Sequence, residues 1–164
     1  MVDQDKVQQE LAANIGVALE LAKAGKPYEE VIRHLGTVPR HHRKELASGG
    51  NGASIEPKSR MFSEINFSVT GADKGAPARI ATLEFIAVKG AFNFQHLNAL
   101  SGEWRRSPPE PEECSFALAW FPSHDVRSGA PFSLYAEYAP FTTSIDPAQT
   151  PSRVFFQTAD GRWD

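Results

Sequence analysis

The stretch RMFSEINFSVT, residues 60–70, decides the fold. In it Ile65, Phe67 and Val69 stand at every second position, the alternation of a β-strand that buries one face. Before this stretch the apolar residues recur every three or four positions, as on one side of an amphipathic helix. The change of period near residue 60 therefore predicts a helical part followed by a sheet part.

The helical part is expected to contain two helices and a shorter third segment. An apolar stripe runs through residues 7–22, and Gly25 stands where a helix C-terminal cap is favoured. A second helix is expected to begin at Pro27, since proline suits the first helical turn, and to end at Gly36. Residues 39–47 suit one or two further helical turns. The short break between the first two helices predicts a helical hairpin.

The rest of the chain is expected to form the sheet. Residues 48–59 begin with SGGNGAS and are interpreted as a flexible linker. Strands are predicted at 61–69, 78–89, 114–121, 132–138 and 153–158, and residues 90–100 suit either a strand or a short helix. The prediction is a single α+β domain over residues 1–164, with a helical part (1–47), the linker (48–59) and a sheet part (60–164). The hairpin is expected to pack on one face of a curved, mostly antiparallel sheet of five to six strands.

Composition narrows the class of protein. Hydrophobic residues make up 41% and charged residues 23% of the chain, as in an ordinary globular domain. The net charge of −3 argues against nucleic acid as a partner, because phosphate binding needs a surplus of Lys and Arg. The N-terminus is polar, and no apolar run has the length of a membrane span, so neither a signal peptide nor a membrane partner is expected. A cytoplasmic location follows, with a processed, secreted form left open.

One region is strongly basic. Residues 33–60, called here the basic elbow, carry six Lys and Arg against two Glu, a net charge of +4. Five consecutive residues form its centre and are predicted to bind a partner: Arg40, His41, His42, Arg43 and Lys44. The alternative is a solvated basic turn. A metal ion on the two histidines is disfavoured because the flanking cations would repel it, and no cofactor is expected.

Aromatic residues are more numerous than one sheet face needs to bury. We expect Trp104, Trp120 and Tyr135 to contribute to an open sheet face that contacts a partner. Loops folded back over that face are the alternative. A third possibility is a homodimer in which two copies bury this face against each other.

No catalytic or cofactor motif is present. Cys114, the only cysteine, excludes an intrachain disulfide and is expected to be a buried, inert thiol. The alternative is a small enzyme or small-molecule binder with a cavity between the helices and the curved sheet. Its candidate residues are His124, His96, Glu84 and Tyr138, with His124 as a general base beside a strand carboxylate.

The leading prediction is therefore a non-catalytic protein that binds a partner protein or its own copy. A small acidic α+β domain of this kind resembles bacterial inhibitor or immunity-type proteins in shape alone. No residue motif supports a family name.

Overall fold

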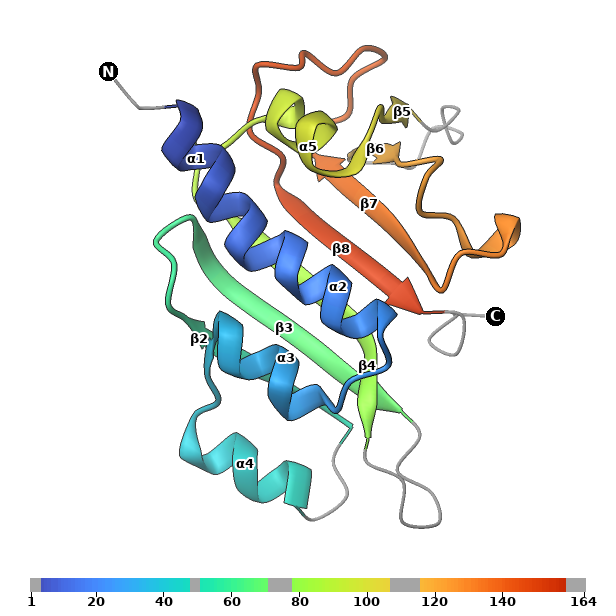
Figure 1. Ribbon diagram of the computed structural model, residues 1–164. Helices are drawn as coiled ribbons and strands as arrows, with labels where there is room; N and C mark the ends of the chain where they lie inside the picture. Colours follow the sequence, from blue (N-terminus) through green and yellow to red (C-terminus); the bar gives the residue numbers. More distant parts are fainter. Residues whose placement is uncertain (1–3, 48–50, 71–77, 107–115, 159–164) are drawn as a thin grey trace.

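The computed structural model describes residues 4–47, 51–70, 78–106 and 116–158 (Figure 1). Within these residues, eight strands form one sheet in the order β1-β2-β3-β4-β8-β7-β6-β5. All pairings are antiparallel, and the C-terminal strand β8 lies in the middle between β4 and β7. Segregated helices and an antiparallel sheet make the protein α+β.

The sheet contains two pairs of longer strands, β3 with β4 and β7 with β8, and ends in very short edge strands. The strands are β1 (Gly36–Thr37), β2 (Gly52–Pro57), β3 (Phe62–Thr70), β4 (Arg79–Ala87), β5 (Arg105–Arg106), β6 (Ala117–Trp120), β7 (Phe132–Tyr138) and β8 (Arg153–Thr158). Both edge strands, β1 and β5, have two residues. Edges this short offer few unpaired backbone groups to another chain, so edge-to-edge association is disfavoured.

The helices lie mostly on one side of this sheet (Figure 1). They are α1 (Gln4–Leu11), the π-helical η1 (Ala12–Gly16), α2 (Val17–Lys23), α3 (Tyr28–Leu35), α4 (Arg40–Ala47), α5 (Phe94–Ser101) and the 3-10 turn η2 (Val126–Ser128). The first three run on as one long helix. The π segment has a local cause: the Asn14 side chain donates a 2.8 Å hydrogen bond to the Glu10 carbonyl, which the Asn14 backbone N–H would use in an α-helix.

Several expectations need correction. The sheet has eight strands rather than five to six, because two-residue strands carry no periodic signal. Residues 52–57 of the expected linker form strand β2, while 48–50 lie outside the described residues. The ambiguous stretch 90–100 contributes to helix α5. The helices at the N-terminus are present, but the expected hairpin is not confirmed.

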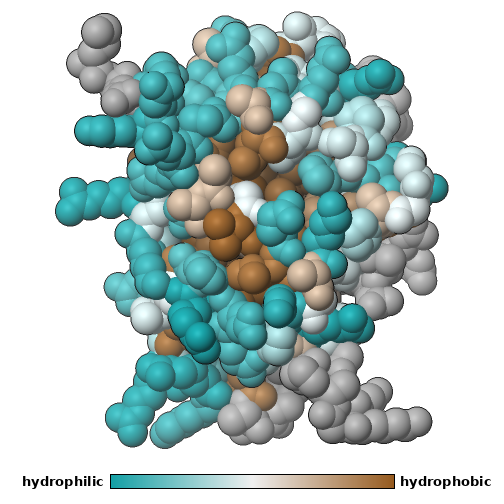
Figure 2. All heavy atoms as spheres, viewed as in Figure 1, coloured by the Kyte–Doolittle hydropathy of each residue, from teal (hydrophilic) through white to brown (hydrophobic). Residues whose placement is uncertain are grey.

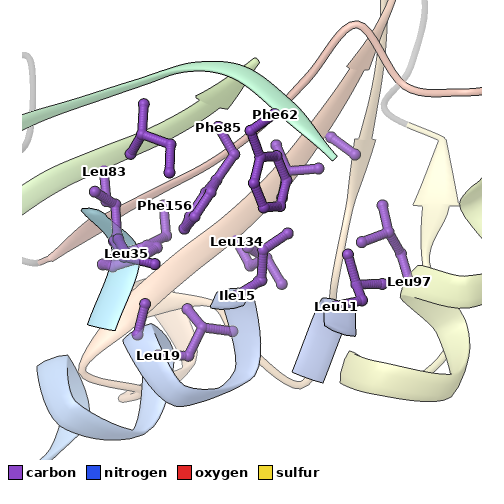
Figure 3. Close-up of a cluster of buried hydrophobic side chains, with 14 of the residues drawn as sticks. Leu11, Ile15, Leu19, Leu35, Phe62, Leu83, Phe85, Leu97, Leu134 and Phe156 are labelled. Atoms are coloured by element: carbon purple, nitrogen blue, oxygen red, sulfur yellow. The ribbon is translucent and has the colours of Figure 1, made fainter. Parts of the chain in front are cut away.

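The core lies between the long helix and the sheet. Leu11, Ile15 and Leu19 project from the helix onto Phe85 and neighbouring sheet residues (Figure 3). Each apolar side chain removed from water in this way contributes about 1.5–3 kcal/mol. Along Leu11 to Leu19 the space between the long helix and the sheet is therefore filled by side chains, and a cavity of about 210 Å³ remains beyond it, at the end of α2.

The alternation of side chains along the strands determines which residues lie on the other face of the sheet, called here the open face. Residues directly opposite each other on paired strands share a face. One row of this open face crosses six strands as Ser54, Asn66, Glu84, Phe155, Tyr135 and Trp120, all half-buried.

The helix-bearing face is mostly hydrophilic at its surface, with apolar side chains gathered near its middle (Figure 2). Its polar residues thus surround the apolar patch over the long helix.

Candidate functional site

A groove lies between α3 and α4, at the end of the sheet formed by β1 and β2. It has a volume of about 450 Å³ and is lined by Tyr28, Glu29, Ile32, Arg33, Thr37, Val38, Arg43 and Leu46. We call it the α3–α4 groove. Its volume falls within the range of about 300–1,000 Å³ that is usual for ligand sites.

The groove exists because α4 brings little apolar surface to its neighbours. Its sequence is RHHRKELA, and none of its described side chains is buried. Leu46 is half-buried and packs against the core from the side. By contrast, α3 buries Val31, Ile32 and Leu35. One well-packed helix beside one poorly packed helix leaves a space between them with an apolar floor.

Two arginines border this apolar floor. Arg33 comes from α3 and Arg43 from α4, and both side chains are exposed. Within the described part of the chain, neither guanidinium forms a hydrogen bond or an ion pair. The carbonyl of Arg33 accepts a 2.6 Å hydrogen bond from Lys58 Nζ, which brings a third positive charge near this end of α3.

Glu29 is the acidic member of the lining and lies next to Tyr28. Burial, followed by the charge of Glu29 and a hydrogen bond with that carboxylate, raises the pKa of the Tyr28 hydroxyl. Tyr28 therefore remains a neutral donor at physiological pH. Its ring stacks on Phe67, with 5.9 Å between the centroids, which fixes this wall of the groove to β3.

The five central residues of the basic elbow lie in the first part of α4, and they have two different roles. Arg40, His41, Arg43 and Lys44 are exposed. His42 is half-buried, and its Nδ1 accepts a hydrogen bond of 3.3 Å from the backbone N–H of Ser54 on β2. His42 thus satisfies a donor on the strand next to the sheet edge. Among the described residues, no group of His, Cys, Asp and Glu is arranged to hold a metal ion.

The expected aromatic residues are separated from this basic surface. Trp120 pairs with Tyr135 on the open face, and Tyr135 stacks on Phe155 with 5.2 Å between the ring centroids. Five strand spacings separate β2 from β6, about 24 Å across the sheet. Trp104 packs instead against the core ring of Phe94, at 5.3 Å. The residues predicted to bind a partner therefore do not form one patch.

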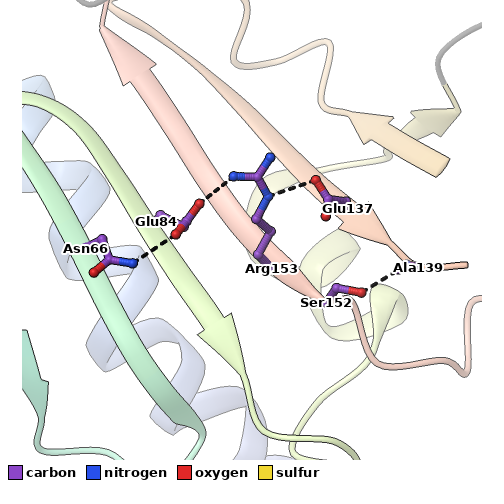
Figure 4. Close-up of polar contacts among 6 residues, drawn as sticks. All are labelled: Asn66, Glu84, Glu137, Ala139, Ser152 and Arg153. Carbon is purple, nitrogen blue, oxygen red and sulfur yellow. Dashed lines mark hydrogen bonds and ion pairs between the residues drawn. The ribbon is translucent and has the colours of Figure 1, made fainter. Parts of the chain in front are cut away.

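A polar network crosses the open face (Figure 4). Arg153 Nε donates to Glu137 at 2.8 Å, and its second nitrogen pairs with Glu84, which also accepts from Asn66 Nδ2 at 3.0 Å. The Arg153 guanidinium lies 4.4 Å from the ring centroid of Phe155. Burial alone would lower the pKa of Arg153, but the two carboxylates outweigh it and the pKa is raised. Because its charges are paired, we interpret this network as structural.

The four candidate catalytic residues do not converge. His124 stacks on the core residue Phe132, with 5.1 Å between the rings. Glu84 lies on the open face (Figure 4), whereas Phe132, on which His124 stacks, belongs to the core on the other side of the sheet. Tyr138 packs edge-on against Phe94 at 6.5 Å. No hydrogen bond, ion pair or ring contact joins any two of the four, all of which are described.

His96 has a structural role instead. Its Nδ1 accepts from the Asn93 backbone N–H at 3.0 Å, while the Asn93 side chain accepts from the His96 backbone N–H at 3.1 Å. This capping box begins α5. His96 Nε2 contacts the Gln4 amide oxygen at 2.6 Å and therefore carries the proton of the neutral ring. His96 thus ties α5 to the long helix.

Comparison of the chain with known proteins identifies no family. No family model, curated protein or solved structure matches the chain. The described helices also include none that is long and apolar enough to cross a bilayer. Cys114 lies outside the described residues.

Sequence reasoning missed most of the groove. Tyr28 and Ile32 fall within the second expected helix, and Arg33 was expected only as part of the basic elbow. The available signal was the composition of residues 40–47, in which Leu46 and Ala47 are the only apolar residues. A helix with so few apolar residues cannot pack closely against its neighbours.

Proposed function

We propose that this is a non-catalytic binding protein that recognises a partner protein through the α3–α4 groove and the exposed basic residues of α4. One observation carries the proposal: an apolar-floored cavity of about 450 Å³ is bordered by Arg33 and Arg43, which have no partner among the described residues. Apolar pockets flanked by arginine are typical of the sites that contribute most to protein–protein affinity. Like an inhibitor or immunity-type protein, it would act by occupying its partner.

Charge supports a protein partner at this end of the molecule. The chain has a net charge of −3, yet the basic elbow has +4. A local charge opposite to that of the whole molecule orients an approaching acidic surface and raises its association rate. The paired charges of the open face offer no comparable attraction.

A small amphipathic anion is the second candidate. The groove volume is in the range of small-molecule sites, and its lining combines an apolar floor with cationic groups. This revises the position of the cavity expected from the sequence. The α3–α4 groove is larger than the cavity of about 210 Å³ where the end of α2, at Ala22 and Lys23, meets the sheet at Ile80 and Thr158.

The test is affinity capture from the lysate of the native organism, with quantitative mass spectrometry. The bait is the full chain, compared with the triple variant Arg40→Glu, Arg43→Glu and Lys44→Glu. A matched control, Lys6→Glu with Lys89→Glu and Arg105→Glu, reverses three exposed charges elsewhere.

We expect proteins that bind the wild type and the control to be lost from the triple variant. Equal recovery by all three baits would remove the groove and the basic residues of α4 from consideration. Circular dichroism melting of each variant verifies that the baits are folded.

A further inference from the structure

Resting on the proposed function, we propose the chemistry of the segment that the groove accepts: an acidic segment of the partner protein that inserts one apolar side chain between α3 and α4, with carboxylates on both sides of it bound by Arg33 and Arg43.

The apolar side chain follows from the floor of the groove. Ile32 and Val38 are exposed by only 6% and 9%, and Leu46 closes the far side while half-buried. These side chains face a cavity of about 450 Å³. An apolar group placed there removes additional surface from water on both partners, which favours binding.

The carboxylates follow from the two arginines. A guanidinium presents a planar fork of N–H donors that pairs with a carboxylate through two parallel hydrogen bonds. Arg33 and Arg43 belong to different helices and border the same cavity. Acidic residues before and after the apolar side chain would therefore each meet one arginine.

Glu29 sets a limit on where the acidic residues bind. It borders the groove beside Tyr28, and its negative charge contributes to the raised pKa of the Tyr28 hydroxyl. A carboxylate brought close to Glu29 would be repelled, so the segment must place its acids toward Arg33 and Arg43. The groove therefore restricts the orientation of the bound segment and also favours a segment with negative charge.

Other anionic partners fit the groove less well. A membrane-binding helix needs a broad exposed apolar face, whereas α4 has Leu46 as its one large apolar residue, and this side chain is half-buried. A nucleic acid would be opposed by the net charge of −3. A segment with both an apolar side chain and fixed carboxylates uses every feature of the lining.

The experiment measures binding of fluorescein-labelled short peptides to the full chain by anisotropy. The first probe has one tryptophan flanked on each side by two glutamates. In the second, serine replaces the tryptophan, and in the third, lysines replace the glutamates. Sodium decanoate and vesicles of phosphatidylserine and phosphatidylcholine are the remaining probes.

We expect the first peptide to bind, and the serine and lysine peptides to bind at least about tenfold more weakly. Arg43→Ala should weaken the first peptide about tenfold. The charge-swapped pair, Arg33→Glu with Arg43→Glu, should prefer the lysine peptide, a reversal that damage to the fold would not produce. Ile32→Ser should weaken the tryptophan peptide but leave the serine peptide unchanged.

The inference is overturned if the lysine peptide binds the wild type as well as the glutamate peptide does, or if the swapped variant keeps its preference for acid. It is also overturned if decanoate or the vesicles displace the first peptide at lower concentration than unlabelled peptide does. If the first peptide fails to bind while the triple variant still loses the captured proteins from the lysate, only the inference is wrong. If the triple variant captures the same proteins as the wild type, the proposed function itself is wrong.

Discussion

Arg153 is the side chain of the open sheet face whose removal should have the largest effect. It lies on β8, the strand inserted between β4 and β7, and it bonds to Glu84 on one side and Glu137 on the other. It also lies 4.4 Å from the ring centroid of Phe155. The substitution Arg153→Met keeps most of the side-chain length and removes all three electrostatic contacts.

The size of the effect follows from exposure. The side chains of Arg153, Glu84 and Glu137 are exposed by 32%, 28% and 14%, so these pairs are neither fully solvated nor fully buried. Exposed pairs contribute about 0.2–1 kcal/mol, and hydrogen bonds to charged groups in buried sites about 1.5–3 kcal/mol. We take about 1 kcal/mol for each pair and about 0.5 kcal/mol for the aromatic contact. The expected loss is therefore about 2–3 kcal/mol of unfolding free energy.

The assay is urea unfolding followed by circular dichroism, with Arg105→Met as the matched control. Arg105 is exposed and lies on the edge strand β5. We expect Arg153→Met to lower the unfolding free energy by about 2–3 kcal/mol, and its melting temperature by about 5–10 °C. Arg105→Met should change the free energy by less than about 0.5 kcal/mol.

A second comparison isolates the ion pairs. Glu84→Gln and Glu137→Gln, each combined with Arg153→Met, form two double-mutant cycles. We expect a coupling free energy of about 0.5–1 kcal/mol in each cycle. If Arg153→Met is no more destabilising than Arg105→Met, or if both couplings are zero, the network does not stabilise the sheet.

Two further predictions concern stability. Burial lowers the pKa of His96, and burial followed by the charge of Lys23 lowers that of His124, with Glu20 partly opposing. Below about pH 6.5 the unfolded chain therefore binds more protons than the folded chain. The unfolding free energy should have its full value above that pH and fall as the pH drops below it. Urea titrations at several pH values test this, and an unfolding free energy that does not change with pH would contradict it. Phe85→Ala, which opens a cavity at a fully buried position, should cost about 3–5 kcal/mol, against less than about 1 kcal/mol for the exposed Val88→Ala, both measured by urea unfolding. Equal losses for these two variants would contradict the assignment of the core.

Strong local periodicity made much of the fold predictable. The alternation through residues 61–69 and 132–138 identified β3 and β7, because side chains on a strand point to opposite faces in turn. The apolar spacing in residues 7–22 likewise identified the long helix. These signals depend only on neighbours in the chain, so a single sequence contains them.

Elements held by distant contacts were not predictable in this way. The edge strands β1 and β5 exist only through pairing with β2 and β6, and two residues have no period. Strand β2 begins in a glycine-rich stretch that favours a loop, yet pairing with β3 holds it in the sheet. Here tertiary context outweighed local propensity.

The candidate sites show the same division. The sequence alone determined that helices are followed by strands and that residues 33–60 carry a net positive charge. Only the tertiary structure decided that His124 and Glu84 lie on opposite sides of the sheet, that Trp120 lies about 24 Å across the sheet from β2, and that Arg33 and Arg43 border one groove. The physical reason is that local spacing determines which face a side chain occupies, whereas the order of the strands and the quality of helix packing determine which faces meet.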